Sequence, residues 1–247
     1  MPFSRRKRYT VCVYGSSSAN TPKQYLEAAR KLGNVLADGG HICVNGAGRA
    51  GCMGALNDGV TERCGRVRGV IHEMWIVDKS EHPNVKDLQV VSGEGLQERK
   101  RGLQKNSDCI IALPGGVGTW DELWEIVCLK AVGLSNVPIC VLDVDDFYEG
   151  FKIQILRAQR DHLLYADAHR LLHFESDPTK AVEWCVSQLK NSNGKGMAVH
   201  PLPRRSTPAE ASPTQKAWTI PGGLLVACGV LVISTSAGCL VYTRFRG

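Results

Sequence analysis

Three glycine-rich turns carry residue types that suit a bound phosphate group. The sequences YGSSSAN, NGAGRAGCMG and PGGVGT each overlap or follow the end of an apolar run, at residues 9–15, 41–46 and 108–113. The carboxyl ends of parallel strands meet at one edge of a sheet, and ligands bind there. Each turn also precedes a predicted helix, whose first N–H groups favour an anion. Together the turns predict a nucleotide or sugar-phosphate site.

Two common nucleotide-binding signatures do not fit these turns. None contains the Gly-Lys-Ser/Thr end of a P-loop, which argues against ATP or GTP hydrolysis by that route. Residues 46–51, GAGRAG, match G-x-G-x-x-G, but they follow the second predicted strand, and no convincing ribose-binding acid follows the next one. The pattern therefore disfavours a dinucleotide-dependent dehydrogenase.

Glu122 follows the third turn and has two interpretations. Thr119 and Glu122 fit the T-x-x-E capping box, in which both side chains satisfy free N–H groups at a helix start. The positive end of that helix would also keep the carboxylate ionised at neutral pH. An ionised carboxylate beside a phosphate could instead stabilise positive charge at a ribose C1 and orient water while an N-glycosidic bond breaks. The residue types favour the cap and leave the catalytic role open.

Arg99 and Lys100 are the candidate cations. They lie in EGLQERKRGLQKN, residues 94–106, and on a helical projection they flank the apolar stripe of Leu96 and Leu103. Long cationic side chains at such positions often cover the core with their stems and leave their charges in water. Because this helix precedes the strand and turn that lead to Glu122, the cations could also face the same crevice. An arginine there can bind phosphate or donate hydrogen bonds to a leaving group.

The elements that must position these residues alternate between strand and helix over residues 9–190. Residues 21–38 predict an amphipathic helix, with Thr21 as N-cap, Pro22 as the first helical residue and Gly39 as the stop. Strands without polar alternation, separated by helices, are buried on both faces. The predicted fold class is α/β, a Rossmann-like, doubly wound, mostly parallel sheet. Apolar runs place its strands at residues 9–15, 41–46, 65–71, 87–91, 108–113 and 137–143.

Composition limits the classes of partner. The net charge of the 247 residues is +6, and part of it lies in RRKR, residues 5–8, and in the residues after Pro201. No aromatic residues interleave with the basic segment, so we do not expect a nucleic-acid partner. The ten cysteines are dispersed and form no C-x-x-C pair. This predicts buried, reduced thiols in a reducing compartment, with neither a disulfide framework nor a metal site.

The chain divides by composition into five segments. Residues 191–216 are rich in Pro, Ser, Gly and charge, which predicts a flexible linker after the α/β domain. The uncharged residues that follow predict a membrane anchor. The predicted boundaries are a basic N-terminal segment 1–8, the domain 9–190, the linker 191–216, a transmembrane helix 217–243 and a short basic tail 244–247.

The membrane anchor is predicted from length and from its ends. A helix over residues 222–242 would span roughly 30 Å at about 1.5 Å per residue, the thickness of a bilayer's hydrocarbon core. Trp218 and Tyr242 would lie at the two interfaces. The alternative is a buried core helix, which a preceding linker and the lack of a polar face disfavour. We expect a tail-anchored membrane protein whose catalytic domain lies in the cytosol, without a secretory signal peptide.

Two of these motifs together resemble those of a known family. ERK, residues 98–100, and PGGVGTWDE, residues 114–122, are similar to the R-K pair and the PGGxGTxxE signature of the LOG family. These are the cytokinin riboside 5′-monophosphate phosphoribohydrolases, often labelled lysine decarboxylases. The resemblance covers about residues 9–190 and includes the first two glycine-rich turns. The linker and the C-terminal segment lie outside it.

The resemblance implies a homodimer that hydrolyses a nucleoside 5′-monophosphate to free base and ribose 5-phosphate, without metal or organic cofactor. It implies Arg99 and Glu122 as the catalytic residues. Nothing indicates a pyridoxal-phosphate site, so decarboxylation is not expected. A non-catalytic nucleotide-binding module and a nucleotide hydrolase of another base specificity stay as alternatives. The expected substrate-binding residues are Glu81, Lys100, Asp121, Gly15, Ser16, Gly46, Gly115, Gly116, Val117, Gly118 and Thr119.

Four features depart from the family pattern. Ala47 interrupts what is usually a run of three glycines and would crowd the backbone's approach to the ligand. Leu103 replaces a frequent methionine, Trp120 is bulkier than the usual residue, and IHEMW lacks the usual proline. Because the core pair is intact, the resemblance implies retained activity and leaves base preference open.

Overall fold

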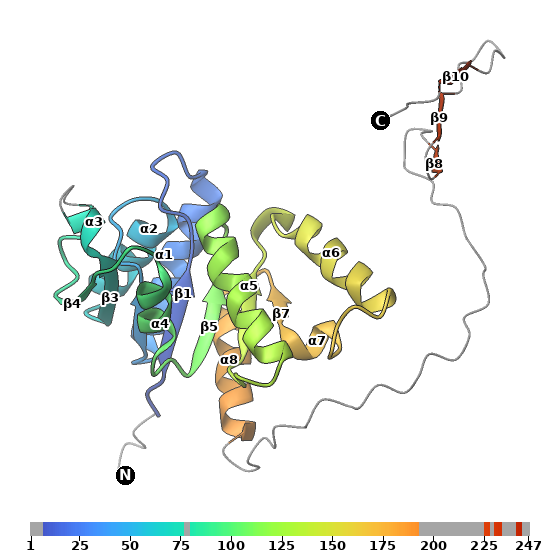
Figure 1. The fold of residues 1–247 in the computed structure, drawn as a ribbon. Helices are drawn as coiled ribbons and strands as arrows, with labels where there is room; N and C mark the ends of the chain where they lie inside the picture. The colour runs from blue at the N-terminus through green and yellow to red at the C-terminus, as the bar shows by residue number, and fades with distance from the viewer. Residues whose placement is uncertain (1–6, 77–79, 193–224, 228–229, 234–240, 244–247) are drawn as a thin grey trace. The chain divides into compact units, whose positions relative to one another are not determined.

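The computed structural model describes residues 7–76 and 80–192 and three short segments, 225–227, 230–233 and 241–243. The first two ranges contain a seven-stranded sheet in the order β4-β3-β2-β1-β5-β6-β7, with every neighbouring pair parallel (Figure 1). The predicted doubly wound parallel sheet is thus confirmed. The strands are β1 (Thr10–Tyr14), β2 (Ile42–Asn45), β3 (Arg66–His72), β4 (Asp87–Val91), β5 (Cys109–Ala112), β6 (Ile139–Leu142) and β7 (His173–Glu175).

Helices cover both faces of this sheet (Figure 1). Those on one face are α1 (Lys23–Asp38), α2 (Gly51–Glu62) and α8 (Pro178–Ser192), and those on the other are α4 (Gln97–Gln104), α5 (Val117–Ala131), α6 (Glu149–Arg160) and α7 (Ala168–Leu171). Single turns, α3 (Glu73–Ile76) and the 3₁₀ turn η1 (Val144–Asp146), follow β3 and β6.

The core is two apolar layers, one on each side of the sheet. Val11 and Val13 of β1 pack into one layer, whereas Cys12 and Tyr14 pack into the other. Successive strand side chains point to opposite faces, so a strand with both faces covered must be apolar at every position. This is why the strand sequences read as continuous apolar runs.

The chain order reverses between β1 and β5, at the centre of the sheet. From β1 the strands run outward through β2, β3 and β4 on one side and through β5, β6 and β7 on the other. Ligands of open α/β sheets bind outside the carboxyl ends of the strands at such a reversal. The turns after β1, β2 and β5 are therefore neighbours at this point, as the sequence predicts.

The cysteines act as packing groups. In the described residues all eight cysteines are free, and six of them are buried. Burial raises the pKa of the Cys43 thiol to about 12 and that of Cys52 to about 11. Such thiols stay protonated at neutral pH, in agreement with the dispersed sequence pattern.

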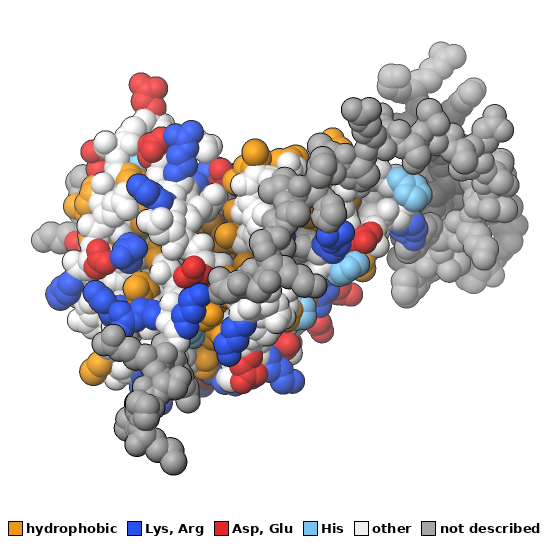
Figure 2. Space-filling view, turned by 90° about the horizontal axis from the view of Figure 1, so that it is seen from below, with side chains coloured by type: hydrophobic (Ala, Val, Ile, Leu, Met, Phe, Trp, Pro, Cys, Tyr) orange, Lys and Arg blue, Asp and Glu red, His pale blue; other side chains and the backbone are white. Residues whose placement is uncertain are grey.

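Acidic and basic side chains are interspersed on the molecular surface that Figure 2 draws. Several form exposed ion pairs, such as Lys23 with Glu27 and Arg68 with Asp87.

Helix α1 begins one residue later than predicted, and the predicted N-cap role of Thr21 is wrong. Pro22 is the N-cap, and its carbonyl accepts hydrogen bonds from the N–H groups of Tyr25 and Leu26. The Thr21 hydroxyl donates to the Ser18 carbonyl at 2.7 Å and lies 2.8 Å from the Ser16 hydroxyl. Thr21 is therefore used to hold the first glycine-rich turn. The predicted stop of the helix at Gly39 is confirmed.

The predicted transmembrane helix over residues 217–243 is not seen where this range is described. Its described residues are short antiparallel strands, β8 (Leu225–Ala227), β9 (Val230–Ile233) and β10 (Val241–Thr243), and the others lie outside the described residues. Short apolar runs rich in valine and isoleucine fit strand and helix alike, so periodicity could not separate them. In the described part of the chain no helix is long and apolar enough to cross a membrane.

Helix α8 ends two residues past the predicted domain end, at Ser192, and most of the predicted linker lies outside the described residues.

Helices α1 and α2 are in close contact because of two glycines. A Cβ added at Gly33 would lie 2.3 Å from the Leu56 carbonyl oxygen and 2.8 Å from the Val60 nitrogen. A Cβ at Gly59 would lie 2.2 Å from the Arg30 carbonyl oxygen. These neighbours are backbone atoms, which cannot swing away. The two glycines therefore set how closely α2, and the turn that precedes it, packs against α1.

We predict that Gly33→Ala lowers the free energy of unfolding by about 1–3 kcal/mol, the usual cost of overpacking, although alanine is the better helix former. Gly150→Ala in α6 is the control, because an added Cβ there meets no heavy atom within 4 Å. It should be neutral or stabilising by up to about 1 kcal/mol. Urea unfolding of the full chain measures both, and equal midpoints would contradict the close helix contact.

Candidate active site

The three glycine-rich turns are joined around Ser16. The Ser16 N–H donates to the Pro114 carbonyl at 3.1 Å, and the Ser16 carbonyl accepts from the Met53 N–H at 3.0 Å. Gly51, with a φ of +63°, lies against the same residue, because an added Cβ would be 2.5 Å from the Ser16 carbonyl oxygen. The turns after β1, β2 and β5 therefore form one continuous surface.

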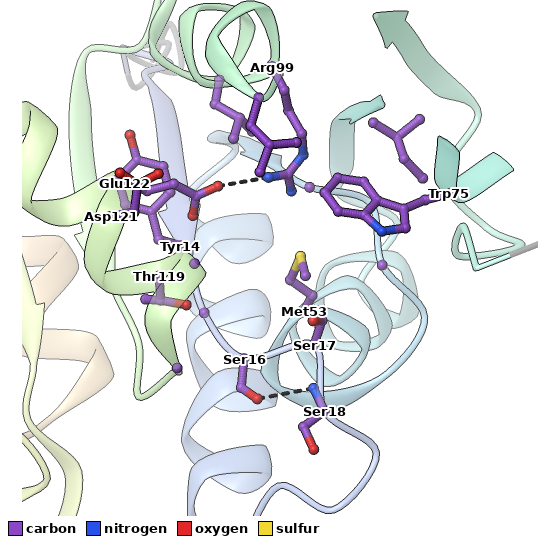
Figure 3. Close-up of a pocket in the computed structure, with 18 of the residues that line it drawn as sticks. Tyr14, Ser16, Ser17, Ser18, Met53, Trp75, Arg99, Thr119, Asp121 and Glu122 are labelled. Atoms are coloured by element: carbon purple, nitrogen blue, oxygen red, sulfur yellow. Dashed lines mark hydrogen bonds and ion pairs between the residues drawn. The ribbon is translucent and has the colours of Figure 1, made fainter. Parts of the chain in front are cut away.

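This surface encloses one side of a cavity of about 500 Å³, a volume typical of small-ligand sites. Figure 3 shows the serines of the first turn and Thr119 at one end, and Arg99, Glu122 and Trp75 at the other. Most of the predicted site residues line it: Gly15, Ser16, Gly46, Arg99, Lys100, Gly116, Val117, Gly118, Thr119, Asp121 and Glu122.

Arg99 from α4 and Glu122 from α5 form an ion pair in the cavity wall (Figure 3). Arg99 Nη1 lies 2.9 Å from Glu122 Oε1, and the two side chains are only 10% and 11% exposed. Arg99 Nε donates to the Val70 carbonyl at 3.3 Å, and the guanidinium carbon lies 4.9 Å from the centre of the Trp75 ring. The guanidinium is thus held from three directions, and it fixes the Glu122 carboxylate in turn.

Gly46 and Gly115 provide the space that this arrangement needs. A Cβ at Gly46 would lie 2.0 Å from Arg99 Nη2, so any side chain there would displace the guanidinium. A Cβ at Gly115 would lie 2.2 Å from Thr119 Oγ1 and 3.0 Å from the Ser16 nitrogen. Gly115 therefore supports the wall from behind and is not part of the lining.

The predicted capping box is wrong, because α5 begins earlier than the sequence suggested. Gly116 is the N-cap and no side chain caps the helix, which places Thr119 within the first turn and Glu122 one turn further along. Val117 and Gly118 lie in the first turn at the cavity, where free N–H groups and the helix dipole favour a phosphate. Glu122, released from capping, is the partner of Arg99.

Burial raises the pKa of Glu122, and the charge and hydrogen bond of Arg99 oppose that rise. The positive end of α5 has little effect on Glu122, because the field of a helix end falls off within the first turn. When ionised, a carboxylate of raised pKa accepts a proton more readily than an exposed one. The site therefore contains a desolvated carboxyl group that can accept a proton, beside a cation.

Lys100 connects α4 to α5. Its Nζ lies 3.0 Å from Asp121 Oδ2 and 2.9 Å from Glu125 Oε2, and its side chain is 7% exposed. Burial alone would lower the pKa of Lys100, but the hydrogen bonds and charges of Glu125 and Asp121 outweigh it and raise the pKa. The lysine is charged, and two carboxylates already balance that charge.

Besides Gly115, three residues singled out from the sequence do not line the cavity. Glu81 pairs with Gly48 in an isolated bridge beside the second turn. Ala47 adopts a φ of +58°, and its methyl group faces Gly69, where a Cβ would lie 2.5 Å from it. Trp120 is 42% exposed. The expected crowding of the ligand by Ala47 is therefore wrong, because its methyl group is buried in the core.

Arg49, Met53 and Trp75 line the cavity and were not predicted. Arg49 lies within the second glycine-rich turn, so its position in a predicted phosphate-binding segment was the available signal. Met53 follows the same turn on α2, and Trp75 lies on α3. No periodicity marks either as facing a ligand, since their orientation depends on how these short segments pack.

Comparison with known proteins agrees with this geometry. A family model described as "Possible lysine decarboxylase" matches residues 53–185. The cytokinin riboside 5′-monophosphate phosphoribohydrolase LOG of Oryza sativa subsp. japonica is 34% identical over 169 residues, which are 68% of this chain and 69% of that protein. The corresponding LOG5 of Arabidopsis thaliana is 37% identical over 145 residues, or 59% of this chain and 62% of that protein.

Solved structures show a similar fold. The molybdenum cofactor binding protein of Rippkaea orientalis is 20% identical, with a TM-score of 0.55 over 75% of this chain and 99% of that one. The molybdenum cofactor carrier protein of Chlamydomonas reinhardtii is 22% identical, with the same score and coverage. At this identity the likeness concerns the fold alone. From the match to the family model and the LOG relatives, together with the paired Arg99 and Glu122, we conclude that this chain belongs to the LOG family.

Proposed function

We propose that this protein hydrolyses the N-glycosidic bond of an adenine-type, cytokinin nucleoside 5′-monophosphate and releases the free base and ribose 5-phosphate. The observation that carries the proposal is the buried Arg99–Glu122 pair in a cavity that is also lined by the N-terminus of α5. The names of the LOG relatives give the substrate class.

The polar end of the cavity suits the 5′-phosphate. The first-turn N–H groups of α5 and the hydroxyls of Ser16, Ser17 and Ser18 can donate hydrogen bonds to its oxygens. A phosphate bound there leaves the sugar and base to extend toward Arg99 and Glu122. The apolar residues beside that pair suit a planar base, namely Met53, Ile71, Trp75, Leu96 and Leu103.

Glu122 has the environment that glycosidic cleavage requires. When the bond between C1 of the ribose and the base nitrogen breaks, its electron pair leaves with the base and positive charge develops on the sugar. The Glu122 carboxylate stabilises that charge and accepts a proton from the water that adds to C1. The departing base takes up this proton, which balances the reaction. Arg99 keeps the carboxylate in place and donates hydrogen bonds toward the leaving group.

We predict that Glu122→Gln lowers kcat by about 10²–10⁴-fold, the usual contribution of a general base, without loss of the folded state. In the wild type, activity requires the ionised carboxylate, so the rate should fall as the pH falls through the pKa of Glu122. Since that pKa is raised, the midpoint of the acid limb should lie above the ordinary value of 4.5. Release of base and ribose 5-phosphate from AMP and N6-substituted AMP measures both effects.

Glu98→Gln is the matched control, because Glu98 lies on the same helix as Arg99 but is exposed and pairs with Arg101. Its activity should equal that of the wild type. A folded wild type that binds AMP without releasing base would favour a non-catalytic binding module. Release from other nucleoside monophosphates but not from adenine-type ones would favour another base specificity.

We further propose that the protein is a homodimer that associates through α5 and α6. Apolar side chains on these helices are unusually exposed: Trp120 and Trp124 by 42% and 40%, and Ile153 and Leu156 by 60% and 58%. The two helices are joined by a stacked contact of Trp124 with Phe151, 4.2 Å between ring centres. Exposed apolar surface of this kind is often an association site.

Charges placed on this surface should separate the dimer. Light scattering is expected to give twice the chain mass for the wild type and the single chain mass for a variant with both Ile153→Glu and Leu156→Glu. Val90→Glu is the control, since Val90 is 52% exposed but lies on β4, remote in the sheet order from α5 and α6. A monomeric wild type, or a dimeric double variant, would contradict the proposed interface.

We also propose that residues 217–243 attach the protein to a membrane, with the α/β domain in the cytosol. The support is compositional: the segment has no charged residue and is long enough to cross a bilayer as a helix. Deletion of residues 217–247 should move the protein from the membrane pellet to the soluble fraction after cell lysis and leave its activity unchanged. A full-length protein already in the soluble fraction would show that the proposed anchor is wrong.

A further inference from the structure

Among the described residues that line the cavity, one cation, Arg49, forms no ion pair. Of the basic side chains in the lining, Arg99 is paired with Glu122, and Lys100 is paired with Asp121 and Glu125. Arg49 has no carboxylate partner within the described residues, and its side chain is exposed. An unpaired guanidinium at the wall of a cavity is the group most available to an anionic ligand.

The backbone of Arg49 is firmly held, although its side chain is exposed. Its N–H donates to the Ser80 carbonyl at 3.0 Å. On the other side its carbonyl is in close contact with α2, because a Cβ added at Gly54 would lie 2.3 Å from the Arg49 oxygen. The backbone of Arg49 therefore has one position. Only the side chain would lose conformational entropy when it binds a ligand.

The position of Arg49 in the turn places it near the phosphate-binding end of the cavity. Two residues later, Gly51 packs on the first turn, where an added Cβ would lie 2.5 Å from the Ser16 oxygen and 2.9 Å from the Ser18 nitrogen. Ser16 in turn bonds to Pro114, which precedes the start of α5. The turn that carries Arg49, the serines and the α5 end thus form one side of the cavity.

We propose that Arg49 binds the phosphate group of the substrate, opposite the N-terminus of α5. A phosphate monoester carries about −1.5 to −2 charges at neutral pH, more than the roughly +0.5 of one helix end can balance. A guanidinium matches two phosphate oxygens with two parallel N–H groups. Arg49 therefore makes the site select a phosphorylated nucleoside over the free nucleoside. The assignment of the group as a substrate phosphate rests on the proposed function.

The test compares Arg49→Ala and Arg49→Lys with Arg66→Ala in the full-length protein. Arg66 is the matched control. It is also exposed, but it is the first residue of β3 and so lies at the amino ends of the strands, whereas the cavity lies at their carboxyl ends. We expect Arg49→Ala to raise KM for AMP by about 10–100-fold, because the phosphate loses a charged hydrogen-bond donor. The value of kcat should change less than about threefold. Arg49→Lys should recover part of the loss, since it keeps the charge but not the paired donors. Arg66→Ala should match the wild type.

Binding measurements separate this assignment from the proposed reaction. Calorimetry with inorganic phosphate and with AMP should show weaker binding to Arg49→Ala and unchanged binding to Arg66→Ala. If no variant releases base but phosphate binding still depends on Arg49, hydrolysis is wrong and the anion site stands. If Arg49→Ala binds inorganic phosphate like the wild type, or if adenosine binding weakens as much as AMP binding, the phosphate role is overturned.

Discussion

The buried ion pair between Arg99 and Glu122 is the interaction on which the rest of the site depends. Two charges removed from water cost several kcal/mol each, and loss of one partner leaves the other uncompensated, typically at about 3–5 kcal/mol. Such a pair is a poor means of stabilising a fold. Here α4 and α5 each contribute one partner, and Val70 and Trp75 hold the guanidinium. The pair lowers the stability of the fold, but it keeps the Glu122 carboxylate desolvated, oriented and beside a cation.

The order of the strands explains why so few contacts suffice to build the site. Because β1 lies between β2 and β5, three turns from distant parts of the chain become neighbours without long loops. Ser16 then joins them with two main-chain hydrogen bonds. The same sheet positions the serines and the N-terminus of α5 at one end of the cavity and the ion pair at the other. Preorganisation of this kind reduces the cost of binding and catalysis.

The strands and the edge of the sheet that binds the ligand could be predicted from the sequence, because the same pattern of an apolar run followed by a glycine-rich turn recurs along the chain. Continuous apolar runs predicted the six strands β1 to β6, and the glycine-rich turns at their ends predicted the ligand edge. Local detail was less predictable. Thr21 and Thr119 both fit N-cap patterns, yet neither caps a helix. In each case another residue is the N-cap, Pro22 for α1 and Gly116 for α5. The orientations of Ala47, Met53 and Trp75 depend on packing, which no local pattern encodes.

The contact between Gly46 and Arg99 links two positions that are far apart in the chain. The guanidinium occupies the volume that a side chain at position 46 would need. A substitution at position 46 therefore requires the guanidinium to move or the side chain at position 99 to be shorter, and a shorter side chain at position 99 alone would leave an empty space in the wall. A change at either position alone therefore alters the wall of the cavity. In homologous chains, a glycine at the first position without an arginine at the second would identify a cavity that binds its ligand by other means.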